Sequence, residues 1–118
     1  KILLADDDPI ILKFLGTVLK KNGYDFAVAI NGMEVMEKTK SYGPDLILLD
    51  LMMPDPDGFK VCRILRADPH FMFIPIIILT ALDDNDSRIV AFGAGANDFL
   101  TKPFRSTELV ERIRKLTL

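Results

Sequence analysis

Wholly apolar runs alternate along the chain with stretches whose apolar residues recur at helical spacing. Residues 2–5, 46–49 and 76–79 are apolar at every position. Such runs are typical of strands that are buried on both faces of a parallel sheet. Residues 24–30 and 97–101 predict two further strands, of which the second is short. The pattern therefore predicts five strands.

Each predicted strand is followed by a predicted helix. Asp8 and Pro9 indicate the start of the first helix, as its N-cap and first helical residue. Asn31 with Glu34 three residues on is typical of a capping box at the start of the second helix, which ends at residues 43–44. Apolar stripes mark the other helices: Ile11, Phe14, Leu15, Val18 and Leu19; Phe59, Cys62 and Leu65; Ile89 and Phe92; Leu109, Ile113 and Leu116.

Five strand–helix units in succession predict one domain over residues 1–118. Crossovers between parallel strands are right-handed and helices cover both faces, so we expect an α/β fold. Its architecture is a three-layer doubly wound (βα)5 sandwich with a five-stranded parallel sheet. The expected strand order is the flavodoxin-like 2-1-3-4-5, whose ligand site lies at the carboxyl ends of the strands beside the switch point.

Polar residues stand at the carboxyl ends of four predicted strands. Asp6 and Asp7 follow the first, Asp50 the third, Thr80 the fourth and Thr101-Lys102 the fifth. These ends share one edge of a parallel sheet, so we expect the side chains to converge. Two unit charges about 5 Å apart repel by roughly 3 kcal/mol at an effective dielectric near 20. Three carboxylates therefore need a cation, and oxygen-only ligands favour Mg²⁺ or Mn²⁺ over zinc.

The same residues favour phosphate chemistry. Mg²⁺ commonly binds together with phosphate, for which Lys102 offers a positive charge and Thr80 a hydroxyl donor. A carboxylate such as that of Asp50 can attack phosphorus and form an aspartyl phosphate. Taken singly, these aspartates are also ordinary turn residues. Their combination with Lys102 favours phosphoryl transfer.

Other conspicuous residues favour structural roles. We expect Cys62 in the core and His70 on the surface. Phe71 and Phe73 either cover the edge of the core or form an exposed patch for a partner. Helix caps, turns and surface positions account for the remaining aspartates of interest, Asp8, Asp55, Asp57, Asp83, Asp84 and Asp86.

Composition excludes several classes of protein. With 15 basic and 17 acidic residues the net charge is -2, which gives no bulk affinity for nucleic acid or anionic membranes. One cysteine excludes an internal disulfide and favours a reducing compartment, the cytoplasm. No apolar run has membrane-spanning length, and no signal peptide is visible. The chain starts with lysine and ends within helical periodicity, which indicates an excised or processed domain.

Several short motifs, in this order and spacing, resemble the receiver domain of bacterial two-component response regulators, the CheY-like family. The resemblance covers essentially the whole chain. The matching pieces are Leu-Ala-Asp-Asp-Asp-Pro at 4–9, Pro-Asp-Leu-Ile-Leu-Leu-Asp-Leu-Met-Met-Pro at 44–54, Asp-Gly at 57–58, Ile-Leu-Thr-Ala at 78–81, Gly-Ala at 95–96 and Lys-Pro-Phe at 102–104.

The resemblance implies a phosphoacceptor and a metal site. Asp50 would take a phosphoryl group from a phosphohistidine on a sensor histidine kinase or a phosphotransfer protein. Asp7, Asp50 and the backbone carbonyl of Met52 would bind Mg²⁺, and Asp6 would act through water. The domain would catalyse only its own phosphorylation and dephosphorylation, and is in this sense not an enzyme.

The resemblance also implies a switch. Thr80, Lys102 and backbone N–H groups near Met52 and Ala81 would contact the phosphoryl oxygens, and the Lys102-Pro103 bond would be cis and aim the lysine at Asp50. Thr80 and Phe99 would then reshape the face made by the fourth helix, fifth strand and fifth helix. That face would control an output domain or target protein, or form a phosphorylation-dependent homodimer, without direct nucleic acid or membrane binding by this domain.

Four positions depart from the family pattern. Phe99 stands where tyrosine is common, and Pro56 where methionine is frequent. Met52 and Leu82, two residues beyond Asp50 and Thr80, are apolar and orient no water, which predicts slow self-dephosphorylation.

Two alternatives stay open. A haloacid-dehalogenase-like phosphatase also uses Asp, Thr, Lys and Mg²⁺, but would need a second aspartate where Met52 stands. A degenerate receiver would serve as an interaction module without accepting phosphate; the complete acidic set argues against it.

Overall fold

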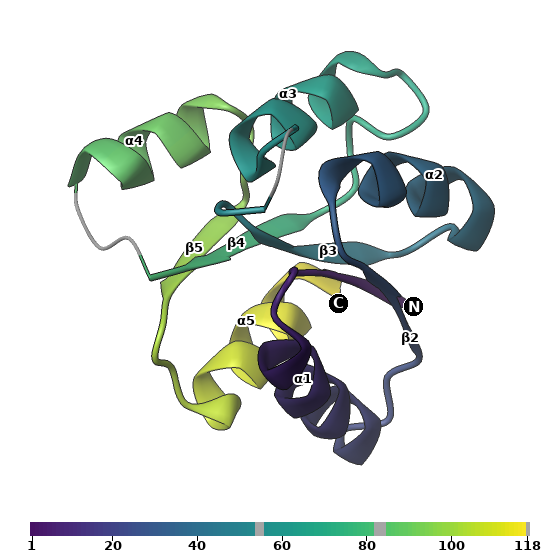
Figure 1. The fold of residues 1–118 in the computed structure, drawn as a ribbon, viewed down its shortest axis with the longest axis vertical. Helices are drawn as coiled ribbons and strands as arrows, with labels where there is room; N and C mark the ends of the chain where they lie inside the picture. Colours follow the sequence, from purple (N-terminus) through teal and green to yellow (C-terminus); the bar gives the residue numbers. More distant parts are fainter. Residues whose placement is uncertain (54–55, 82–84, 118) are drawn as a thin grey trace.

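The computed structural model describes residues 1–53, 56–81 and 85–117 (Figure 1). Within them, five strands alternate with five helices. Their bounds are β1 Ile2–Ala5, α1 Pro9–Lys21, β2 Phe26–Ala29, α2 Gly32–Tyr42, β3 Leu46–Asp50, α3 Gly58–Ala67, β4 Ile76–Thr80, α4 Asn85–Gly93, β5 Asp98–Thr101 and α5 Ser106–Thr117. No helix of this described part combines the length and apolar character that a bilayer crossing requires.

The strands form one parallel sheet in the order β2-β1-β3-β4-β5, which confirms the predicted fold class. Helices α1 and α5 cover one face, and α2, α3 and α4 cover the other (Figure 1). Alternate strand residues supply the two cores: Leu3, Ile47 and Ile78 belong to one, whereas Leu4 and Leu48 belong to the other. Because each strand feeds both cores, its sequence is apolar throughout.

Strand bounds differ slightly from those predicted. Strand β2 spans residues 26–29 rather than 24–30, because as an edge strand it pairs only with the four residues of β1. Strands β3 and β4 each extend one residue further than predicted. As a result, Asp50 and Thr80 are the last residues of their strands and lie inside the hydrogen-bonded sheet.

The predicted helix caps are confirmed where the structure describes them. The Asp8 carboxylate accepts from Ile10 N at 2.9 Å. The Asn31 side chain accepts from Glu34 N at 2.9 Å, while the Glu34 carboxylate accepts from Ile30 N at 3.2 Å, one residue before the expected position. Asp57 caps α3 and Asp86 lies in the first turn of α4. Three of the other residues discussed above, Asp55, Asp83 and Asp84, lie outside the described residues, as does Leu82.

Candidate functional site

Three carboxylates converge at the carboxyl edge of the sheet. Asp6 and Asp7 directly follow β1, and Asp50 ends the neighbouring β3. One carboxylate oxygen from each lies within 4.8 Å of the other two. Asp6 and Asp50 are only 2% and 6% exposed, whereas Asp7 is exposed. The cluster therefore has a buried base and an open side.

The turns that follow the strands hold two of these carboxylates in place. Asp8 N donates to Asp6 Oδ1 at 2.9 Å, and Met52 N donates to Asp50 Oδ1 at 3.2 Å. In both cases the backbone N–H two residues on occupies one carboxylate oxygen, which is the local geometry that aspartate favours in turns. Both Oδ2 atoms are left facing the side chain of Lys102.

Lys102 brings the one ammonium that the described residues place against the cluster. Its Nζ lies 2.8 Å from Asp6 Oδ2 and 3.8 Å from Asp50 Oδ2. Its backbone N donates to Thr80 O at 2.7 Å, and the Lys102-Pro103 peptide bond is cis. The nearer partner is thus Asp6, although the expectation from resemblance was that the lysine would be aimed at Asp50. One ammonium leaves the three carboxylates only partly balanced.

The surroundings of Asp50 raise its pKa from the ordinary value of 3.8 to about 6. Burial is the main cause, and the charges of Asp6 and Asp7 add to it. The Met52 N–H and the Lys102 ammonium act in the opposite direction. Near neutral pH Asp50 is therefore ionised, but its charge is held in a place that disfavours it.

The donor set of this cluster suits a hard divalent cation. All three candidate ligands are carboxylates, and the one cysteine and the one histidine of the chain lie elsewhere: Cys62 is buried in the core and His70 is exposed beside Asp68. Oxygen ligands with an open side match Mg²⁺, which keeps several of its waters. The residues present therefore fit that ion.

The remaining predicted site residues lie on β4 and β5 or in the turns that follow β3 and β4. Thr80 is fully buried at the end of β4, and Ala81 and Met52 are exposed in the turns that follow their strands. No acid stands at position 52, where a dehalogenase-like phosphatase would need one. Phe99 on β5 is 2% exposed, so its ring points inward.

Arg88 was not among the residues that the sequence singled out. Its guanidinium lies 4.9 Å from the centroid of the Phe99 ring, and its Nη2 donates to Thr101 Oγ1 at 3.2 Å. Arginine over an aromatic face is a favourable pairing. The only signal in the sequence is an arginine near the start of a predicted helix, which gives no indication of the ring that it covers.

An apolar hollow of about 440 Å³ opens beside Lys102, between α1 and the chain after β5. Phe14, which is 45% exposed, and Phe104 face each other there with ring centroids 6.4 Å apart. The sequence placed Phe14 in the buried stripe of its helix, but the α1 surface leaves nearly half of the ring accessible. The open side of the acidic cluster thus has an apolar neighbour.

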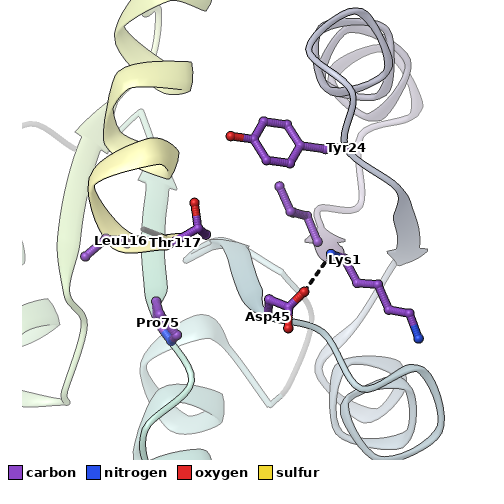
Figure 2. A pocket seen from close by; sticks show the side chains of 7 residues that line it. Lys1, Tyr24, Asp45, Pro75, Leu116 and Thr117 are labelled. Atoms are coloured by element: carbon purple, nitrogen blue, oxygen red, sulfur yellow. Dashed lines mark hydrogen bonds and ion pairs between the residues drawn. The ribbon is translucent and has the colours of Figure 1, made fainter.

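A second hollow, of about 330 Å³, lies at the opposite edge of the sheet (Figure 2). Residues before strands line it together with the end of α5, among them Tyr24, Pro75 and Leu116. The amino group of Lys1 pairs with Asp45 at 2.8 Å on its rim. Of the two phenylalanines at this end, Phe71 packs against the core and Phe73 is 85% exposed, so one of them covers the core edge and the other does not.

Comparison with known proteins gives consistent matches. The family model described as "Response regulator receiver domain" matches residues 2–114. The chain is 43% identical over 116 residues to the DNA-binding dual master transcriptional regulator RpaA of Synechocystis sp., covering 98% of this chain and 48% of that protein. It is 42% identical over 114 residues to the DNA-binding response regulator MtrA of Mycolicibacterium smegmatis, covering 97% and 49%. The chain spans about half the length of these relatives.

Solved structures agree. A putative response regulator from Chloroflexus aurantiacus superposes with a TM-score of 0.94 at 36% identity, covering 98% of this chain and 95% of that one.

Proposed function

The chain belongs to the family of response regulator receiver domains, and from that premise we propose that it is a phosphorylation-controlled switch with Asp50 as its phosphoacceptor. Receiver domains of this family are signalling domains that receive phosphoryl groups from histidine kinases and act on output domains. The observation that carries the assignment to Asp50 is its position. It is the buried carboxylate that ends β3, with two further carboxylates and the Lys102 ammonium beside it.

In the proposed reaction, a carboxylate oxygen of Asp50 attacks the phosphorus of a phosphohistidine. A phosphorus–oxygen bond forms while the phosphorus–nitrogen bond of the donor breaks, and the released imidazole takes up a proton. Lys102 balances charge on the transferring group, and Thr80 together with the N–H groups near Met52 and Ala81 supplies hydrogen-bond donors. Such fixed donors stabilise a phosphoryl-transfer transition state.

Asp7, Asp50 and the carbonyl of Met52 are the proposed protein ligands of Mg²⁺, with Asp6 acting through water. A bound Mg²⁺ neutralises negative charge on the carboxylates and on the phosphoryl group. The raised pKa of Asp50 supports this part of the proposal, because a carboxylate that is disfavoured without a cation gains most from one.

The apolar hollow beside Lys102 supports a docking role in the same reaction. A phosphohistidine sits on a protein surface, so that surface must contact the rim of the acidic cluster when the histidine reaches Asp50. Phe14 and Phe104 offer accessible apolar area on this rim. Buried aromatic anchors are typical of protein interfaces.

The output of the switch is the least specific part of the proposal. An output domain or a target protein reads the face formed by α4, β5 and α5, after Thr80 and Phe99 respond to the phosphoryl group. The two longer relatives are DNA-binding regulators, and we propose DNA binding for a longer protein that contains this chain. We also propose a cytoplasmic location, where phosphohistidine donors and Mg²⁺ are available.

Intact mass spectrometry tests the assignment. The chain is incubated with acetyl phosphate and Mg²⁺, and we expect the addition of one phosphate to the wild type and none to Asp50→Asn. Asp25→Asn is the matched control, because Asp25 is an exposed aspartate beside β2, away from the cluster. Absence of phosphate on the wild type, while the protein is folded, would favour the degenerate receiver; phosphate on Asp50→Asn would place the acceptor elsewhere.

A further inference from the structure

Arg66, in the last turn of α3, makes four hydrogen bonds to two other segments. Its Nη1 donates to Met72 O at 3.0 Å and to Ile74 O at 2.7 Å, both in the loop between α3 and β4. Its Nε donates to Gly95 O at 2.8 Å and its Nη2 to Asn97 Oδ1 at 2.6 Å, both in the turn between α4 and β5. One guanidinium therefore joins three segments, which we call the Arg66 clasp.

The clasp uses the shape of arginine rather than its charge alone. Within the described residues no carboxylate lies at ion-pairing distance from Arg66; three of its four acceptors are backbone carbonyls. Burial lowers the pKa of its guanidinium, so the position costs free energy that the hydrogen bonds must offset. A planar fork with five N–H groups can reach acceptors on three sides, which a lysine ammonium cannot reproduce.

Gly95 is adapted to the same arrangement. Its φ of 109° lies in the region that favours glycine. A Cβ at this position would come within 2.4 Å of Arg66 Cγ, so the arginine stem occupies the room that a side chain would need. Asn97 extends the clasp to β4, because its Oδ1 also accepts from Ile76 N at 2.9 Å and its own N donates to Ile76 O at 2.8 Å.

The clasp lies at the C-terminal end of α4, which packs against the core through two alanines. Ala91 and Ala94, at and just beyond the last turn, are buried. Ile89 is 69% exposed and Val90 40%, so the middle of the helix contributes little apolar anchoring. Helices α3 and α4 lie next to each other on one face of the sheet (Figure 1). The helix begins at Asn85, five residues along the chain from Thr80.

We propose that Arg66 is a positioning residue of the switch: its clasp fixes the C-terminal end of α4 to α3 and β4, so that phosphorylation of Asp50 displaces the N-terminal half of α4 about this fixed end. The inference rests on the proposed function, because it describes which part of α4 moves when Asp50 is phosphorylated. It assigns to Arg66 no part in the chemistry. Without the clasp, the turn between α4 and β5 would move with the helix, and the response would spread along its whole length.

Hydrogen exchange followed by mass spectrometry tests this in the 118-residue chain. Wild type, Arg66→Gln and Arg66→Lys are compared before and after treatment with acetyl phosphate and Mg²⁺. Arg63→Gln is the matched control, since Arg63 is an exposed arginine about one turn earlier on the same helix. Arg66→Lys keeps the charge and most of the stem, and serves if Arg66→Gln does not fold.

We expect amides of residues 90–97 to exchange about tenfold faster or more in both Arg66 variants before phosphorylation, as the loss of charge-assisted hydrogen bonds predicts. β1 and β3 should stay protected as in the wild type. After phosphorylation, the change in exchange within α4 and the turn that follows it should be confined to residues 85–89 in the wild type and in Arg63→Gln, and extend through 97 in the Arg66 variants.

Unchanged exchange at 90–97 in an Arg66 variant would overturn the proposal, as would a uniform loss of protection over the sheet or a wild-type response that already covers all of α4. Phosphate uptake is read separately by intact mass. Failure of the wild type to take up phosphate counts against the proposed function, whereas the exchange before phosphorylation tests the clasp by itself.

Discussion

Replacing Asp50 with asparagine should make the metal-free protein more stable. Burial, together with the charges of Asp6 and Asp7, raises the pKa of Asp50 from its ordinary value of 3.8 to about 6. Between these two values the folded chain binds more protons than the unfolded chain, so the free energy of unfolding falls as pH rises through this range. Above about pH 6 the full penalty for the ionised carboxylate is present, and asparagine removes it while its amide oxygen can still accept from Met52 N.

The size of the gain follows from the shift. One pKa unit corresponds to about 1.4 kcal/mol, so a rise of about two units corresponds to about 3 kcal/mol at neutral pH. In the variant the Lys102 ammonium loses one of its two carboxylate partners, which offsets part of this gain, so we expect a net gain of about 1–3 kcal/mol. Such a gain is large compared with most single substitutions, which destabilise.

Urea unfolding followed by circular dichroism measures it. With EDTA present at about pH 7.5, Asp50→Asn should be more stable than the wild type, and at about pH 4 the difference should shrink to within about 0.5 kcal/mol, since the wild-type carboxyl is then protonated. At ten times its Kd, Mg²⁺ should add about 1.4 kcal/mol to the wild type and clearly less to the variant. A variant that is less stable at the higher pH, or whose gain is the same at both, would refute the reasoning.

Three further predictions concern phosphorylation. Lys102→Gln should lower the rate of phosphate uptake from acetyl phosphate by about tenfold or more, because one charge-assisted contact in the transition state is lost. The same variant should bind Mg²⁺ no more weakly than the wild type, which Mg²⁺ titrations followed by thermal unfolding measure. Phosphorylated Asp50 should lose its phosphate over minutes or longer and not within seconds, because Met52 orients no water, and Met52→Asn should shorten this lifetime in a phosphate-release assay. Phe14→Ala should slow transfer from a phosphohistidine protein by about fivefold or more, because an interface anchor is lost, and should leave uptake from acetyl phosphate unchanged. Phe73→Ala, at the other edge of the sheet, is the control and should change neither rate. Equal effects of the two substitutions would remove Phe14 from the docking surface.

Most of the fold could be predicted because the buried strands have no polar side. Residues 2–5, 46–49 and 76–79 are apolar throughout, and only a sheet covered on both faces accommodates them. The overlong prediction for 24–30 had a different cause. Apolar character continues in the sequence beyond the residues that pair, but the length of an edge strand is set by its single neighbour.

The sequence predicted which residues form the candidate site, but not which of their side chains contact one another. Convergence of Asp50 with the other two aspartates follows from the strand order that is expected for a doubly wound parallel sheet, and the alternation of apolar runs and helical stripes predicts such a sheet. That Lys102 lies nearer to Asp6 than to Asp50 depends on side-chain rotamers, and so does the position of Arg88 over Phe99. The Arg66 clasp left no sequence signal, because most of its acceptors are backbone carbonyls, which every residue has.

The strand order has a mechanical consequence. The acidic cluster stands on β1 and β3, each of which has strands on both sides, whereas β5 is a margin of the sheet with a partner on one side only. Interior strands are the last parts of a domain to open, and marginal elements open first. Under the proposed function, we therefore expect a phosphoryl group on Asp50 to displace β1 and β3 little, and to change the structure mainly at the edge strand β5, which a partner can contact.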